Sequence, residues 1–185
     1  MPDGVLIEEF VRDRDHSARG LRGAVWTAAE PRWRGASSFS RAMRTDPALL
    51  ARVMPTDRAG AEAVIGDLAA EGELRAHFLD YEPFASAPPL RLRPAEVPDG
   101  FREHRLYRVL FAKDPRDGEF TGRRTVGGDH FSWTLRRVGG GLGWGLDVTV
   151  LLASGADDAV GPVLDELTGT LRGRGLIPVT TERFA

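Results

Sequence analysis

Two stretches in the second half of the chain, 130–138 and 143–151, carry polar side chains at alternate positions, which is the period of a β-strand. The candidates for proton transfer are Asp147 and His130, and the candidates for ligand binding are Ser132, Thr134, Arg136 and Thr149. A carboxylate and an imidazole transfer protons, an arginine holds an anionic group, and hydroxyls donate or accept hydrogen bonds. Together on one surface, these side chains would suit a polar or anionic small molecule.

A glycine-rich segment, 139–142, separates the two stretches and is typical of a hairpin loop. A loop of these residues pairs Val138 with Gly143, and Arg136 then lies diagonally across from Asp147. The same register sets apolar residues opposite one another: Leu135 with Leu146, Trp133 with Val148, and Phe131 with Val150. A shift of one residue would oppose apolar to polar side chains, so this register is favoured. The polar face either lines a cavity or is the solvated side of an antiparallel sheet.

The elements around this hairpin follow from the same kind of pattern. Strands are expected at 105–112 and 119–126, with a turn at 114–118. A helix then starts near 157–162 and ends at Gly173 or Gly175. Its expected buried stripe is Val163, Leu164, Leu167 and Leu171. The last strand, 176–184, contains a proline, which predicts a position at the edge of the sheet.

The first half is less regular. The segment 5–11 reads as a strand or a short helix, and 21–29 reads as a strand. Asp46 before Pro47 starts one helix, which Pro55 stops. Thr56 or Asp57 caps a second helix, whose apolar stripe is Val64, Ile65, Leu68 and Ala69 and whose end is set at Gly72. The alternation over 74–78 predicts a strand, with a continued helix as the alternative.

These elements predict an α+β fold, in which helices cover one face of an antiparallel sheet. A ferredoxin-like ββαβ ending fits the last part of the chain, and a helix-grip arrangement is the alternative. The final strand argues against the helix-grip fold, which ends on its helix. We expect a single α+β domain over 1–185; if there are two lobes, their boundary is the proline-rich connector 83–100, which holds an edge strand at 90–92.

Composition excludes several classes of chemistry. The chain has no cysteine, so disulfides, thiolate zinc sites and cysteine nucleophiles are excluded. No signal peptide and no membrane-spanning run are visible, which predicts a cytoplasmic protein without membrane contact. The net charge of −2 and the lack of a recognised motif argue against nucleic acid. All basic residues but Lys113 are arginine, a bias typical of a GC-rich bacterial genome.

Two other groupings resemble sites but have simpler explanations. His77, Asp80 and Glu82 do not converge on a metal ion either as a strand or as a helix. The glycine-rich loop at 139–145 is followed by a strand rather than by the helix that a phosphate loop needs. We therefore expect no metal and no cofactor.

The residues identify no family. Because no nucleophile motif, metal set or cofactor fingerprint is present, the sequence favours a soluble binding or interaction module without a catalytic centre. The alternative is a small cofactor-independent enzyme (an isomerase, cyclase or hydrolase) that acts on a polar or anionic small molecule. The expected partners are such a ligand or another protein, and a homo-oligomer is compatible with both.

Overall fold

The computed structural model describes residues 3–66, 73–74, 76–78, 80–84, 96–141 and 143–185. It contains helices and two antiparallel sheets, so the fold class is α+β, as predicted. The chain divides into two compact units, which we describe separately. Unit 1 comprises Met1–Arg12 and Ala18–Ser86, and unit 2 comprises Asp13–Ser17 and Ala87–Ala185. The expectation of a single domain stays a prediction.

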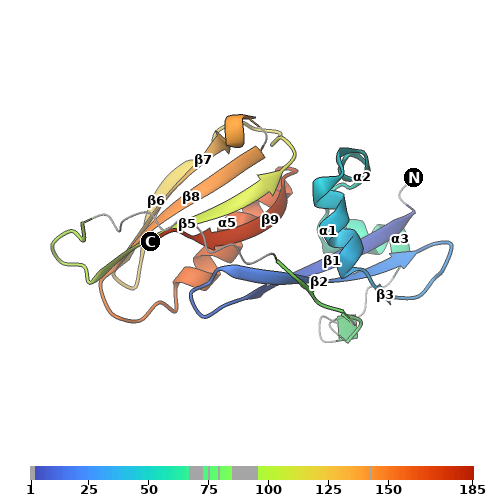
Figure 1. The fold of residues 1–185 in the computed structure, drawn as a ribbon, viewed down its shortest axis with the longest axis horizontal. Helices are drawn as coiled ribbons and strands as arrows, with labels where there is room; N and C mark the ends of the chain where they lie inside the picture. Colours follow the sequence, from blue (N-terminus) through green and yellow to red (C-terminus); the bar gives the residue numbers. More distant parts are fainter. Residues whose placement is uncertain (1–2, 67–72, 75, 79, 85–95, 142) are drawn as a thin grey trace. The chain divides into compact units, whose positions relative to one another are not determined.

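The sheet of unit 1 is built on a long hairpin. Strand β1 (Gly4–Arg12) pairs with β2 (Ala18–Thr27), which also pairs with the short strands β3 (Arg34–Gly35) and β4 (Glu82–Pro83) (Figure 1). The segment 5–11 is therefore a strand and not a helix.

Three helices of unit 1 follow this hairpin: α1 (Ser37–Thr45), α2 (Pro47–Arg52) and α3 (Arg58–Ile65). The carboxylate of Asp46 accepts from the backbone N–H groups of Ala48 and Leu49, and Asp57 accepts from Gly60, so both predicted caps are confirmed. Helix α3 ends earlier than predicted, because Gly66 has a φ of 85°. Leu68, Ala69 and Gly72 lie outside the described residues.

The strand predicted over 74–78 is wrong. Glu73 and Leu74 are helical, and Ala76 and His77 form a turn. Leu74 is buried in a small core with Val5 and Ala61. Ala76 is exposed and Phe78 is half-buried, so the alternate apolar residues do not share a buried face with Leu74. The strand predicted at 90–92 lies outside the described residues.

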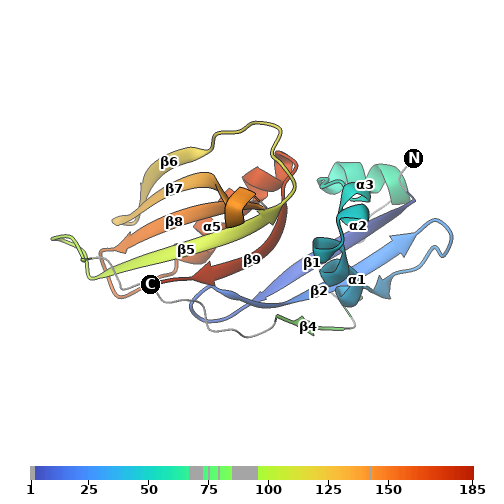
Figure 2. The ribbon, with the colours of Figure 1, turned by 45° about the horizontal axis from the view of Figure 1, so that its top comes forward.

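Unit 2 contains a five-stranded antiparallel sheet with the order β6-β7-β8-β5-β9, which Figure 2 shows side by side. The strands are β5 (Glu103–Ala112), β6 (Thr121–Val126), β7 (Asp129–Val138), β8 (Gly143–Leu152) and β9 (Ile177–Arg183). The predicted edge position of the strand that holds Pro178 is confirmed, because β9 is the last strand of the sheet.

Helix α5 (Val160–Gly173) covers one face of this sheet and lies behind it in Figure 1. The predicted apolar stripe of α5 is confirmed: Val163, Leu164, Leu167 and Leu171 are buried in the core of unit 2. The strands contribute the other side of this core, with the inward-facing residues Val109, Phe131, Leu135, Leu146, Val148 and Val150. The predicted hairpin register is also confirmed, from Val138 opposite Gly143 to Phe131 opposite Val150. The other face of the sheet, which we call the open face, carries the polar candidates. No helix in the described part of the chain is long and apolar enough to span a membrane.

Candidate functional site

The hairpin of β7 and β8 brings most of the polar candidates together on the open face. Ser132 lies opposite Thr149, and Thr134 lies opposite Asp147. Arg136 donates from Nε to Asp147 Oδ2 at 2.7 Å, so the diagonal contact expected from the register is confirmed. Ser132, Thr134 and Arg136 are exposed, whereas Asp147 and Thr149 are half-buried.

Asp147 is held by two arginines. Arg108, on β5, lies directly opposite it and donates from Nε to Oδ1 and from Nη2 to Oδ2, the latter at 3.1 Å. Burial alone would raise the pKa of Asp147, but the hydrogen bonds from Arg108 and Arg136 outweigh it and lower that pKa below its ordinary value. Asp147 is therefore an ionised acceptor at neutral pH.

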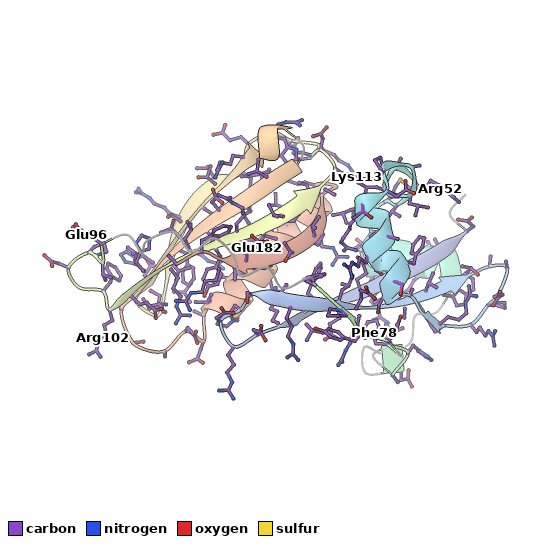
Figure 3. All side chains as sticks on the ribbon, in the orientation of Figure 1. Arg52, Phe78, Glu96, Arg102, Lys113 and Glu182 are labelled. Atoms are coloured by element: carbon purple, nitrogen blue, oxygen red, sulfur yellow. The ribbon has the colours of Figure 1, made fainter. Side chains whose placement is uncertain are left out.

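The two arginines differ in their surroundings. The side chain of Arg108 is 21% exposed, its guanidinium lies over the ring of Phe184 at 4.9 Å, and Glu182 stands opposite it on β9. Figure 3 labels Glu182 beside β5. The side chain of Arg136 is 51% exposed. Arg108 thus serves the packing of the sheet, and Arg136 keeps contact with solvent.

The hydroxyl groups continue across the open face onto β6. Thr121 lies opposite Thr134, and their Oγ1 atoms are 3.1 Å apart. Thr134 lies opposite Asp147, which holds Arg136, and Ser132 and Thr149 form the pair two residues further along the strands. This arrangement offers one cation and several neutral donors and acceptors to a polar molecule.

His130 lies apart from this group. It is opposite Leu151, four residues along β8 from Asp147, which corresponds to roughly 13 Å of strand. Its ring packs edge-on against Phe101, with centroids 4.8 Å apart. His130 and Asp147 are therefore not arranged as a proton-transfer pair, and the catalytic role of either residue stays a prediction.

A second polar network, which the sequence did not indicate, lies at the start of β5. Arg105 is buried, donates to both carboxylate oxygens of Glu103 at 2.7 and 2.8 Å, and donates to the hydroxyl of Tyr107 at 3.3 Å. It also donates to Asp157, just before α5. Hydrogen bonds from Arg105 lower the pKa of Glu103 and of Asp157. Because two carboxylates neutralise this buried cation, the network is a structural link between β5 and the start of α5.

The remaining candidates for metal binding are dispersed. The ring of His77 stacks on Trp33 with centroids 6.2 Å apart, and Asp80 accepts from the backbone N–H of Ser37 at 3.2 Å. Glu82 pairs with Arg41. Within the described residues no three histidine or carboxylate side chains converge on a metal position.

Comparison with known proteins identifies no family and no relative. The chain matches no protein-family model, no curated protein and no solved structure at a significant level. What the chain does must therefore be argued from the open face itself.

Proposed function

We propose that this protein is a binding module that holds a polar small molecule with an anionic group on the open face of unit 2. The observation that carries the proposal is the geometry of Arg136. Its Nε atom is fixed by Asp147, half of its side chain stays exposed, and Thr134 lies two residues along β7 on the same face. A guanidinium held by one edge is pre-oriented, so less side-chain entropy is lost when it binds an anion.

The charge of the open face supports an anionic ligand. The strands place three arginines on this face, Arg108, Arg123 and Arg136, and two carboxylates, Asp147 and Glu182. The charged side chains therefore leave an excess of one positive charge. Glu182 lies opposite Arg108, and Asp147 pairs with both Arg108 and Arg136, so the excess falls at Arg123, which lies opposite Ser132. An anion placed near the hydroxyls would meet this excess.

Two features favour a binding module over the alternative, a small cofactor-independent enzyme. The lowered pKa of Asp147 makes it a poor proton acceptor near neutral pH. His130 lies too far along the strand to share a substrate proton with Asp147. The enzyme would be favoured if the protein turned over a ligand and if both Asp147→Asn and His130→Gln abolished that turnover.

The experiment is a screen of inorganic phosphate and small carboxylates by thermal shift, followed by titration of any ligand that stabilises the protein. The test variant is Arg136→Met, which removes the charge and keeps the apolar stem. The matched control is Arg137→Met: Arg137 is the next residue of β7, points to the opposite face, and is also 51% exposed. We expect Arg136→Met to weaken binding at least about tenfold and Arg137→Met to leave it unchanged. Equal losses in both variants, or no response to any anion, would refute the proposal.

Two finer expectations are proposals as well. A ferredoxin-like ending is supported by the order β8, α5, β9, because β8 and β9 both run antiparallel to the β5 strand between them and so form a split βαβ unit. The helix-grip alternative is less favoured, since β9 follows α5. The cytoplasmic location rests on the sequence alone.

A further inference from the structure

A second surface of unit 2 is the outer edge of β6. This strand is the first of the sheet, and in the described part of the chain it pairs only with β7. The opposite edge, β9, contains Pro178, which lacks an N–H, and an irregularity in its pairing with β5. Strand β6 contains no proline and pairs with β7 without a register shift. It is therefore the edge better suited to accept another strand.

The register of β6 shows which of its backbone groups face outward. The backbone N–H of Leu135 donates to the carbonyl of Phe120 at 2.8 Å, just before β6 begins. Hydrogen-bonded pairs alternate along an antiparallel ladder, so Gly122, Arg124 and Val126 bond to β7. The N–H and C=O groups of the alternate residues face away from β7; these residues are Thr121, Arg123 and Thr125.

The side chains of β6 select the chemistry of the added strand. Arg123 is exposed and forms no ion pair with any described residue, whereas Arg124 is bound to both carboxylate oxygens of Glu166 at 2.8 and 2.9 Å. A residue of an added strand that lies opposite Arg123 would place its side chain on the open face, beside the guanidinium. A carboxylate there would form a cross-strand ion pair. A second copy of β6 would instead bring arginines together, which is destabilising.

We infer that the β6 edge binds an extended acidic peptide segment of another protein by adding it as a sixth strand of the sheet. Backbone hydrogen bonds from Thr121, Arg123 and Thr125 hold the segment, and the Arg123 side chain selects a carboxylate at the facing position. Residues of the segment on the other face lie near Val126 and Trp133, both of which pack on the core of unit 2 and favour apolar side chains. Arg123 lies opposite Ser132, four residues along β7 from Arg136, and the strand addition does not rest on the proposed function.

The test uses the full chain and a peptide matched in length to β6, in which glutamate alternates with valine. Amide hydrogen exchange is measured with and without the peptide. We expect the amides of Thr121, Arg123 and Thr125 to gain protection of at least about tenfold, because they acquire acceptors only in the complex. The amides of Gly122, Arg124 and Val126 are expected to be protected in both states. Protection that appears at β9 instead, or equal binding of a peptide with lysine in place of glutamate, would overturn the inference.

Variants at one position separate the backbone from the charge. Arg123→Pro removes an outward N–H and leaves the bonds to β7 in place, so it is expected to abolish peptide binding. Arg123→Glu keeps the N–H and is expected to reverse the preference from the glutamate to the lysine peptide, which provides a test even if the proline variant does not fold. Unchanged binding in both variants would refute the inference. In the absence of peptide, the three outward amides could instead gain protection as the protein concentration rises. That result would identify a second copy of the chain as the occupant of the edge and would also refute the inference.

Discussion

Arg108 and Asp147 face each other across β5 and β8, and the Arg108 guanidinium donates two hydrogen bonds to the Asp147 carboxylate. The pair joins the central strands of unit 2 and fixes the carboxylate that orients Arg136. The orientation of Arg136, the exposed cation of the proposed ligand site, thus depends on the less exposed ion pair between Asp147 and Arg108, and Arg108 lies on a strand far away in sequence. Stability and ligand binding are expected to be coupled at Asp147.

Asp147→Asn is expected to lower the free energy of unfolding by about 1–3 kcal/mol, because it removes a charged acceptor and leaves two arginines close together. Arg136→Met is the matched control and should cost less than about 1 kcal/mol, since half of that side chain is in solvent. Urea titration, with amide exchange in β5 and β8, measures both. Equal losses would mean that Asp147 acts only through its exposed partner.

The stability of unit 2 should decrease in acid, and Asp147 should account for part of the decrease. Its pKa is lowered in the folded state, so below the ordinary aspartate value of about 3.9 the unfolded chain binds the proton more readily. The contribution of Asp147 is complete above that pH and is lost as the pH falls through the lower, folded pKa. Urea titrations as a function of pH should therefore show a shallower acid limb for Asp147→Asn. Parallel curves for the two proteins would contradict this assignment.

In unit 1, Ser37→Ala should destabilise the protein while Ser38→Ala does not. The buried hydroxyl of Ser37 accepts from the backbone N–H of Gly23 at 2.8 Å and contacts Asp80 at 3.1 Å. Alanine leaves the Gly23 N–H without an acceptor, which costs about 1–3 kcal/mol. Ser38 is the exposed neighbour on the same helix. Urea titration of the two variants compares these costs, and a similar result for both would show that the Gly23 contact adds little.

Gly122→Ala should destabilise unit 2, although alanine is better suited than glycine to ordinary strand positions. A Cβ atom at Gly122 would lie 2.5 Å from Cζ2 of Trp133, whose ring also packs near Phe120. Displacing the indole is expected to cost about 1–3 kcal/mol. Gly118→Ala is the control, because a Cβ there meets no atom within 4 Å. Thermal unfolding, with tryptophan fluorescence as the probe, would report the difference; an unchanged midpoint for Gly122→Ala would show that the ring moves freely.

Local sequence was enough to predict the features that depend on near neighbours. The register of the β7–β8 hairpin follows from a short loop and from alternating apolar residues, and the caps at Asp46 and Asp57 need only the next turn of chain. The contact between Arg136 and Asp147 follows from that register. Each of these contacts joins residues close in sequence, so side-chain period and turn chemistry constrain them strongly.

Tertiary structure alone decided the contacts between distant segments. The pairing of β5 with β8 sets Arg108 against Asp147, and the hydrogen bonds between Asp80 and Ser37 join the segment around Asp80 to α1. Alternation along β5 specifies a face for Arg108 but not a neighbouring strand, because many pairings bury the same apolar residues. The sequence by itself therefore determined a polar face and its register, and only the packing of the whole sheet against α5 determined that this face is open and that its carboxylate is held by two arginines.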